Sequence, residues 1–232
     1  GAVVIMEADT GKVLTMMSNP SYNPNTINEQ WDTISNDENS PLVNRATMGL
    51  YTPGSIFKLF TLEEYLEEGG QSSDYIFNCT GSVQVSGKNI SCANGRSHGT
   101  VDLMGSFANS CNGSFINIGN SLKSGSLSKL CDRMLFNSEL PIKLTYNKSR
   151  FSLADDADDF LKAQTYFGQG ETLCTPMHMA LICSAIANDG VMMEPMYVEK
   201  IENAYGTTIE TFEPKEYKAI FTKVQTDALK PY

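Results

Sequence analysis

The stretch Tyr51–Thr61 constrains the fold most, because it combines a turn with the start of an apolar helix. Pro53 and Gly54 are typical turn residues, and the following residues, SIFKLF, run into an apolar helical pattern. Ser55 and Lys58 are three positions apart, so a helix stacks them on one face. The sequence therefore predicts a hydroxyl and an amine held together at the start of a buried helix.

This pair is typical of nucleophilic catalysis. A serine hydroxyl needs a base beside it, and a lysine is a base only when its proton is loosened. Phe57, Leu59 and Phe60 are predicted to provide apolar surroundings that lower the pKa of Lys58. The backbone amide of Ser55, at the helix start, is a candidate donor to an oxyanion. The alternative is an ordinary core helix capped by serine, because a Ser-x-x-Lys tetrapeptide also arises by chance.

The same helix is expected to have one buried and one exposed face and to stop at Gly69-Gly70. Its predicted buried residues are Ile56, Leu59, Phe60 and Leu66, and its predicted exposed residues are Glu63, Glu64 and Glu67.

Composition excludes several classes of protein. The 232 residues are 41% hydrophobic, which is enough for one enzyme-sized domain. The net charge of -10 argues against a nucleic-acid partner, which would need clustered Lys and Arg. No apolar run approaches the ~20 residues of a transmembrane helix.

The six cysteines show no Cys-x-x-Cys spacing, so we expect neither a zinc site nor another metal, and no cofactor. Cys79 and Cys92 bracket a hairpin-like stretch and could form a disulfide. The alternative is that the cysteines are free thiols, and Cys131, Cys174 and Cys183 lie in apolar helical patterns that suit buried thiols.

Strands are predicted near both ends of the chain and helices between them. The predicted hairpins are Ala2–Met6 with Val13–Met17, and Tyr197–Asn203 with Thr207–Phe212. Helix starts are predicted at Asp102, within the 155–159 acidic run and at Thr175-Pro176. The acidic run lacks the alternation and glycine of a calcium loop. The fold class is therefore α/β (α+β): an antiparallel sheet of N- and C-terminal strands packed with helices, plus a mainly helical subdomain.

Several motifs in chain order resemble the transpeptidase domain of penicillin-binding proteins, most closely the class B group. They are Ser55-Ile56-Phe57-Lys58, Ser110-Cys111-Asn112, and Gly168-Gln169-Gly170 with Thr175-Pro176. The segments GAVVIMEADTGKVLTMMSNPSYNPN, NRATMGLYTPGS, HGTVDL and AIANDG are also similar to the family. Each motif alone is weak, but together they span nearly the whole chain in one order.

The resemblance implies a role for each motif residue. Ser55 would attack the carbonyl between the two terminal D-alanines of a peptidoglycan stem peptide, and Lys58 would take its proton. Ser110 would relay a proton toward the leaving amine, and Asn112 would hydrogen-bond the lysine and the substrate amide. The residues expected to bind substrate or form the groove wall are Gly54, Cys111, Gly168, Gln169 and Gly170.

One family motif is missing where it is expected. The Lys-Thr-Gly strand should follow the second hairpin, but the sequence runs to Tyr232 without it. Lys123-Ser124-Gly125 spells a variant of this motif in a polar connection between helices, so we interpret it as a coincidence. We expect residues 1–232 to be a transpeptidase domain without this strand, either part of a longer enzyme or an impaired one, with an N-terminal anchor and stem domain outside this chain.

The resemblance also implies partners and a location: peptidoglycan stem peptides, β-lactam antibiotics, a glycosyltransferase partner, and the outer face of the cytoplasmic membrane. Two alternatives remain open. A class D β-lactamase or β-lactam sensor is disfavoured because Asn112 stands where class D enzymes have a β-branched apolar residue. A non-catalytic scaffold of wall synthesis is motivated by the missing third motif.

Overall fold

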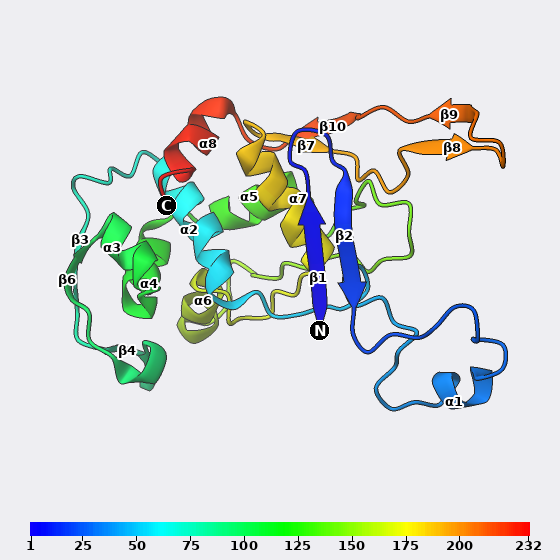
Figure 1. Ribbon diagram of the computed structural model, residues 1–232. Helices are drawn as coiled ribbons and strands as arrows, with labels where there is room; N and C mark the ends of the chain where they lie inside the picture. The colour runs from blue at the N-terminus through cyan, green and yellow to red at the C-terminus, as the bar shows by residue number, and fades with distance from the viewer. The chain divides into compact units, whose positions relative to one another are not determined.

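The computed structural model describes all residues, 1–232, and forms two compact units, each built from separate stretches of chain (Figure 1). The first unit contains Gly1–Tyr51, Glu139–Lys148 and Cys174–Lys223, and the second contains Thr52–Ser138, Ser149–Leu173 and Val224–Tyr232. No helix among these residues is both long and apolar enough to cross a bilayer.

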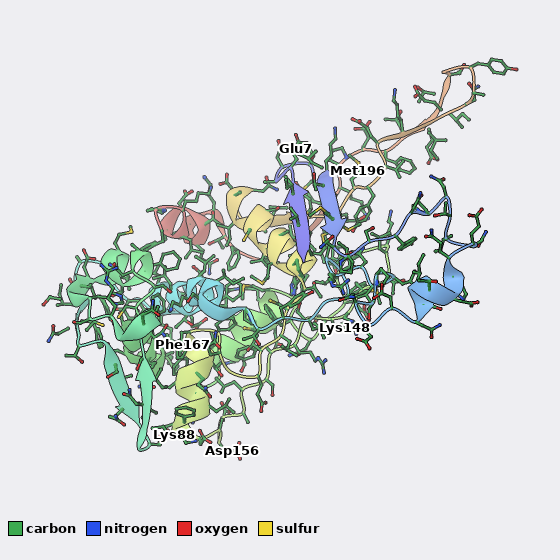
Figure 2. All side chains as sticks on the ribbon, turned by 60° about the horizontal axis from the view of Figure 1, so that its bottom comes forward. Glu7, Lys88, Lys148, Asp156, Phe167 and Met196 are labelled. Atoms are coloured by element: carbon green, nitrogen blue, oxygen red, sulfur yellow. The ribbon has the colours of Figure 1, made fainter.

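The first unit begins with the predicted hairpin. Strands β1 (Ala2–Met6) and β2 (Val13–Ser18) pair antiparallel. Gly11 in their turn has φ +75°, and a Cβ there would lie 2.4 Å from the carbonyl oxygen of Glu194, so only glycine fits. Met196 lies beside this turn (Figure 2) and donates its N–H to the Gly11 carbonyl over 2.9 Å.

Helix α7 (Pro176–Ala187) packs against β1 and begins where the sequence predicts. Thr175 Oγ1 accepts a hydrogen bond from the N–H of His178 at 3.2 Å, which caps the helix. Cys183 on α7 is exposed, so the expectation of a buried thiol was wrong there. The reason is that the buried stripe of the helix follows other positions, namely Met177, Leu181, Ile182 and Ala185.

The second predicted hairpin also forms, as β8 (Lys200–Glu202) and β9 (Thr208–Thr211). It is a separate two-stranded sheet and does not extend β1 and β2. Each strand has a single apolar residue, Ile201 or Ile209, so the hairpin has little apolar surface with which to pack on another sheet. The unit also contains α1 (Trp31–Ser35) and the antiparallel pair β7 (Val191–Met193) and β10 (Glu216–Ala219). The predicted mixture of helices and small antiparallel sheets is confirmed.

The second unit is mainly helical. Its helices are the 3-10 turn Gly54–Phe57, α2 (Lys58–Glu67), α3 (Leu103–Ala108), α4 (Asn112–Ser121), α5 (Ser126–Arg133) and α6 (Asp159–Tyr166), with α8 (Lys223–Leu229) at the end of the chain. Its strands are two antiparallel pairs, β3 (Ile76–Cys79) with β6 (Gly99–Asp102), and β4 (Ser82–Val85) with β5 (Lys88–Ser91), followed by the short 3-10 turn Ala93–Gly95.

Helix starts in this unit follow local sequence rules. Asp102 accepts the N–H of Gly105 at 2.6 Å and caps α3. Asp158 accepts the N–H of Leu161 at 2.7 Å and caps α6, so the acidic run is a helix start, as predicted. Short-range capping therefore sets where these two helices begin.

Helix α2 is buried on more than one side, because both α4 and α5 pack against it. Phe57, Phe60 and Leu62 are at most 1% exposed. The predicted division into two faces was partly wrong: Ile56 is 55% exposed, whereas Glu63 is buried. Glu64 is buried as well. Burial on several sides overrides the simple amphipathic pattern.

Burial raises the pKa of Glu63 to about 7, with the nearby Glu67 carboxylate adding to the effect and Arg133 opposing it. A carboxyl whose pKa is higher in the folded state binds more protons there, so stability falls as pH rises from about 4.5 to 7. We expect Glu63→Gln to be near neutral at pH 5 and to raise the free energy of unfolding at pH 8 by roughly 1–3 kcal/mol. Urea unfolding at both pH values measures this, and equal effects at both would contradict it.

Candidate active site

Ser55 and Lys58 meet at the junction of the 3-10 turn and α2. Ser55 is exposed, whereas Lys58 is buried, with 1% of its surface exposed. Lys58 Nζ lies 3.1 Å from Ser55 Oγ, within hydrogen-bonding distance. The three-residue spacing thus places a buried amine directly beneath an accessible hydroxyl.

The turn between α3 and α4 brings two further predicted residues to the amine. Ser110 has φ +50°, a left-handed conformation that turns the chain between the helices. Lys58 Nζ lies 3.0 Å from the Ser110 carbonyl oxygen, 2.8 Å from Ser110 Oγ and 2.7 Å from Asn112 Oδ1. Ser110 Oγ is also 2.8 Å from Ser55 Oγ. Ser55, Ser110 and Asn112 therefore all contact Nζ of Lys58, so the four residues expected to be catalytic lie together.

The geometry around Nζ limits how its protons are used. The Ser110 carbonyl and Asn112 Oδ1 only accept hydrogen bonds, so two N–H groups of Lys58 donate to them. The third tetrahedral position faces the hydroxyls of Ser55 and Ser110. In the neutral amine this position holds the lone pair, which can accept the Ser55 proton.

Burial lowers the pKa of Lys58 from 10.5 to about 8, with smaller opposing effects from the neighbouring Cys92 and Cys111 thiols. The ring centroids of Phe115 and Phe167 lie 5.7 and 5.8 Å from Nζ. Both side chains are buried, and Phe167 is labelled in Figure 2. The lowered pKa was predicted from apolar neighbours on the same helix, and the two rings lie near the amine as well. These two rings come from distant parts of the chain, so local sequence could not identify them.

Asn112 has a second anchor that sequence analysis missed. Its Nδ2 donates to the backbone carbonyl of Ser91 over 2.9 Å. A backbone carbonyl has no side-chain signature, so the sequence contains no signal for this contact. The bond fixes the orientation of the amide, which leaves Oδ1 directed at Lys58.

Gly168 packs directly beneath the turn that carries Ser55. Its carbonyl accepts the N–H of Gly54 at 2.9 Å. Gly168 has φ +80°, and a Cβ there would lie 2.0 Å from the Gly54 carbonyl oxygen. A Cβ on Gly170 would lie 2.3 Å from Thr165 Oγ1. These two glycines are therefore close-packing positions, while Gln169 between them is exposed.

We predict that Gly168→Ala lowers the free energy of unfolding by about 2–4 kcal/mol, because it adds a backbone clash to a left-handed conformation. Gly87 is a matched control, since it has φ +78° but no atom within 4 Å of a built Cβ. We expect Gly87→Ala to cost only about 1 kcal/mol. Equal losses for the two variants in urea unfolding would contradict close packing at Gly168.

Cys111 does not line a groove, which corrects the expectation that it binds substrate. Its side chain is fully buried, with Sγ 3.8 Å from that of Cys92. The side chains of Ser110 and Asn112 contact Lys58, whereas the side chain of Cys111, between them, points toward Cys92 inside the unit.

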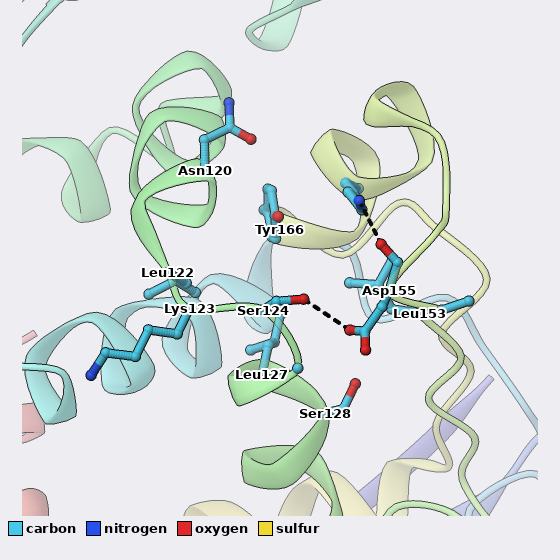
Figure 3. A pocket seen from close by; sticks show the side chains of 12 residues that line it. Asn120, Leu122, Lys123, Ser124, Leu127, Ser128, Leu153, Asp155 and Tyr166 are labelled. Atoms are coloured by element: carbon cyan, nitrogen blue, oxygen red, sulfur yellow. Dashed lines mark hydrogen bonds between the residues drawn. The ribbon is translucent and has the colours of Figure 1, made fainter.

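Lys123-Ser124-Gly125 lies in the connection between α4 and α5, as predicted (Figure 3). The segment borders a hollow of about 250 Å³, where Ser124 Oγ donates to the Asp155 carboxylate over 3.0 Å. It makes no hydrogen bond to Ser55 or Lys58. Its role in the structure is to connect helices.

Comparison with known proteins identifies the family. Residues 1–229 match the sequence profile described as the penicillin binding protein transpeptidase domain. The peptidoglycan D,D-transpeptidase PbpA of Mycolicibacterium smegmatis is 31% identical over 93% of this chain and 46% of its own length. The chain thus spans about half the length of this relative.

Solved structures agree with this assignment. The D,D-transpeptidase domain of a peptidoglycan glycosyltransferase from Eggerthella lenta matches with a TM-score of 0.89 and 28% identity, covering 100% of this chain and 59% of that one. Penicillin-binding protein A from Mycobacterium tuberculosis, solved as an imipenem acyl-enzyme complex, matches with a TM-score of 0.87 and 26% identity, covering 100% and 56%. The chain therefore belongs to the transpeptidase domain family of penicillin-binding proteins, in the class B group that its motifs predicted.

Proposed function

We propose that this chain is the catalytic part of a peptidoglycan D,D-transpeptidase, which cross-links stem peptides through an acyl-enzyme on Ser55 and is acylated there by β-lactams. The observation that supports this most is the contact of Lys58 Nζ with Ser55 Oγ at 3.1 Å, in surroundings that lower the pKa of the amine to about 8. The names of its relatives point to the same reaction.

Acylation starts with transfer of the Ser55 hydroxyl proton to neutral Lys58 Nζ. The serine oxygen attacks the carbonyl of the penultimate D-alanine and forms a tetrahedral intermediate. The backbone N–H of Ser55, at the start of the 3-10 turn, is placed to donate to the oxyanion. Asn112 and the Ser110 carbonyl accept two N–H groups of Lys58 and keep the third position of Nζ directed at the hydroxyls.

Collapse of the intermediate requires a proton on the departing D-alanine amine. Ser110 Oγ lies 2.8 Å from both Lys58 Nζ and Ser55 Oγ, so it can pass a proton from the ammonium to the leaving group. The reverse path then deprotonates the acceptor amine of a second stem peptide. We propose that the substrate backbone lies beside Ser55 against Gly54 and the exposed Gln169, whose side chain lies next to Gly54.

We propose that the full-length protein acts at the outer face of the cytoplasmic membrane, the location that the family resemblance implies. There we propose that it acts with a glycosyltransferase partner that polymerises the glycan strands. Co-purification of the full-length protein with a glycosyltransferase from crosslinked membranes tests this part independently of catalysis.

The direct test of the proposed reaction maps the site of acylation in the full-length protein. We expect penicillin G to add one molecule per chain, and the adduct to fall on the tryptic peptide 46–58, which contains Ser55. Mass spectrometry after digestion locates it. No adduct would favour a non-catalytic scaffold, and rapid turnover of nitrocefin without a stable adduct would favour a β-lactamase. Either result would overturn the transpeptidase proposal.

A further inference from the structure

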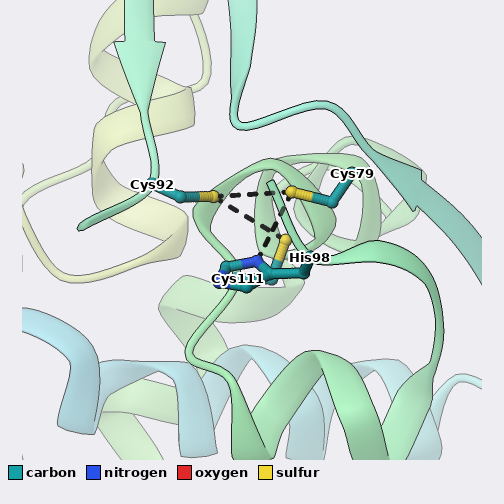
Figure 4. Close-up of side chains that lie close together, drawn as sticks. All are labelled: Cys79, Cys92, His98 and Cys111. Atoms are coloured by element: carbon teal, nitrogen blue, oxygen red, sulfur yellow. Dashed lines mark hydrogen bonds between the residues drawn. The ribbon is translucent and has the colours of Figure 1, made fainter. Parts of the chain in front are cut away.

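Four potential metal ligands converge beside the candidate active site (Figure 4). They are Cys79, Cys92, His98 and Cys111, and their ligand atoms all lie within 4.8 Å of one another. The three cysteines are at most 3% exposed. A set of three sulfurs and one imidazole nitrogen is a common ligand set for structural zinc.

Three of the six distances between the donor atoms match the edges of a tetrahedron, and the other three are at most 4.8 Å. Metal bonds of about 2.3 Å to sulfur and 2.0 Å to nitrogen give edges of about 3.8 Å between sulfurs and about 3.5 Å between sulfur and nitrogen. Cys79 Sγ lies 3.7 Å from Cys92 Sγ and 3.4 Å from His98 Nδ1, and Cys92 Sγ lies 3.8 Å from Cys111 Sγ. These separations far exceed the ~2.05 Å of a disulfide bond.

The segment between Cys92 and His98 is held by hydrogen bonds, including Cys92 N–H to the Gly81 carbonyl at 2.9 Å, and has little apolar packing. Every residue from Ala93 to Ser97 is exposed, so the segment between Cys92 and His98 has no apolar anchor of its own. The partly buried hydrophobic residue that packs against the three cysteines is Phe77. One bound metal ion would connect four elements at once: the end of β3, the end of β5, the start of β6 and the start of α4.

We propose that the chain binds one Zn²⁺ through Cys79, Cys92, His98 and Cys111, and that this zinc positions the Ser110-Cys111-Asn112 turn. Binding releases up to three thiol protons and leaves no position for water, as in a structural site. The cysteine spacing gives no sign of this site, because the four ligands come from separate elements and only the fold brings them together.

The positioning role rests on the proposed function and follows from the contacts of Asn112. Its Oδ1 accepts from Lys58, and its Nδ2 donates to the carbonyl of Ser91. Asn112 directly follows the ligand Cys111, and Ser91 directly precedes the ligand Cys92. Both ends of the hydrogen bond that orients this amide are therefore attached to the same metal site.

Metal content tests the site itself. We expect full-length protein, purified without chelators, to contain one zinc per chain by atomic emission. Cobalt substitution should produce the intense visible bands of tetrahedral Co²⁺ with thiolate charge transfer. Cys92→Ser and His98→Ala should reduce zinc affinity at least 10-fold, whereas Cys183→Ser, an exposed cysteine, should retain full zinc.

Cobalt spectra of the unaltered protein need no variant, so misfolding of a variant does not obscure the result. Absence of zinc together with failure to take up Co²⁺ would overturn the proposal. A Cys79–Cys92 disulfide in the natural protein, detected by mass spectrometry without reduction, would overturn it as well.

Acylation separates this inference from the proposed function. After removal of zinc, at a temperature where circular dichroism shows folded protein, we expect the rate constant for penicillin acylation to fall about 10–100-fold and to recover with zinc. The dissociation constant of the non-covalent penicillin complex should change little. Ser55→Ala should keep one zinc but form no adduct. Unchanged acylation in zinc-free protein would contradict the positioning role, and zinc binding without any acylation of the natural protein would contradict only the proposed function.

Discussion

Replacement of Ser55 by alanine is expected to abolish covalent penicillin binding, with a loss on the order of 10⁴–10⁶ in the acylation rate constant. The reason is that Ser55 Oγ is the exposed hydroxyl that contacts the buried amine, at 3.1 Å. Stopped-flow measurement with a fluorescent penicillin, combined with mass spectrometry of the intact protein, determines this loss.

Two serine variants make the result specific. Ser152 is exposed, and Ser152→Ala should acylate at the natural rate. Ser110→Ala should retain the nucleophile but lose the hydroxyl that lies 2.8 Å from both Nζ and Ser55 Oγ, and we expect a smaller loss of about 10²–10⁴. If Ser55→Ala retained a stable adduct elsewhere in the chain, the assignment of the nucleophile would be wrong.

The second large effect is expected at Lys58. Lys58→Met keeps an unbranched side chain in the buried site but removes the base, and should slow acylation by about 10³–10⁴. Lys58→Arg should not restore the rate, because a guanidinium stays protonated at any accessible pH. The kinetic measurement used for Ser55 applies here too.

Lys129, an exposed lysine on α5, provides the matched control. Lys129→Met should leave acylation unchanged. If Lys58→Arg acylated as fast as the natural protein, Lys58 would act only as a positive charge and not as a base.

Local rules predicted much of this structure. The spacing of Ser55 and Lys58 specified their contact, because residues three apart meet on any helix. The caps at Asp102 and Asp158 fixed two helix starts through hydrogen bonds to N–H groups three residues on. These features depend on neighbours in sequence, so they can be identified without the fold.

Features that depend on distant contacts were missed or wrong. Glu63 looked exposed by periodicity, but packing of α4 and α5 against α2 buries it. The rings beside Lys58, from Phe115 and Phe167, and the ligand cluster around Cys111 are assembled by several elements. No short-range pattern encodes such a set, which is why the cysteine spacing gave no sign that these four side chains lie together.

The central claim is that neutral, buried Lys58 accepts the proton of Ser55, and the pH dependence of acylation tests it most directly. Only the unprotonated amine is a base, so with a pKa of about 8 the acylation rate constant should rise about tenfold per pH unit below pH 7 and level off above pH 9. In Lys58→Met this rise should be absent. A rate constant in the natural protein that stays constant from pH 6 to pH 10 would contradict the account.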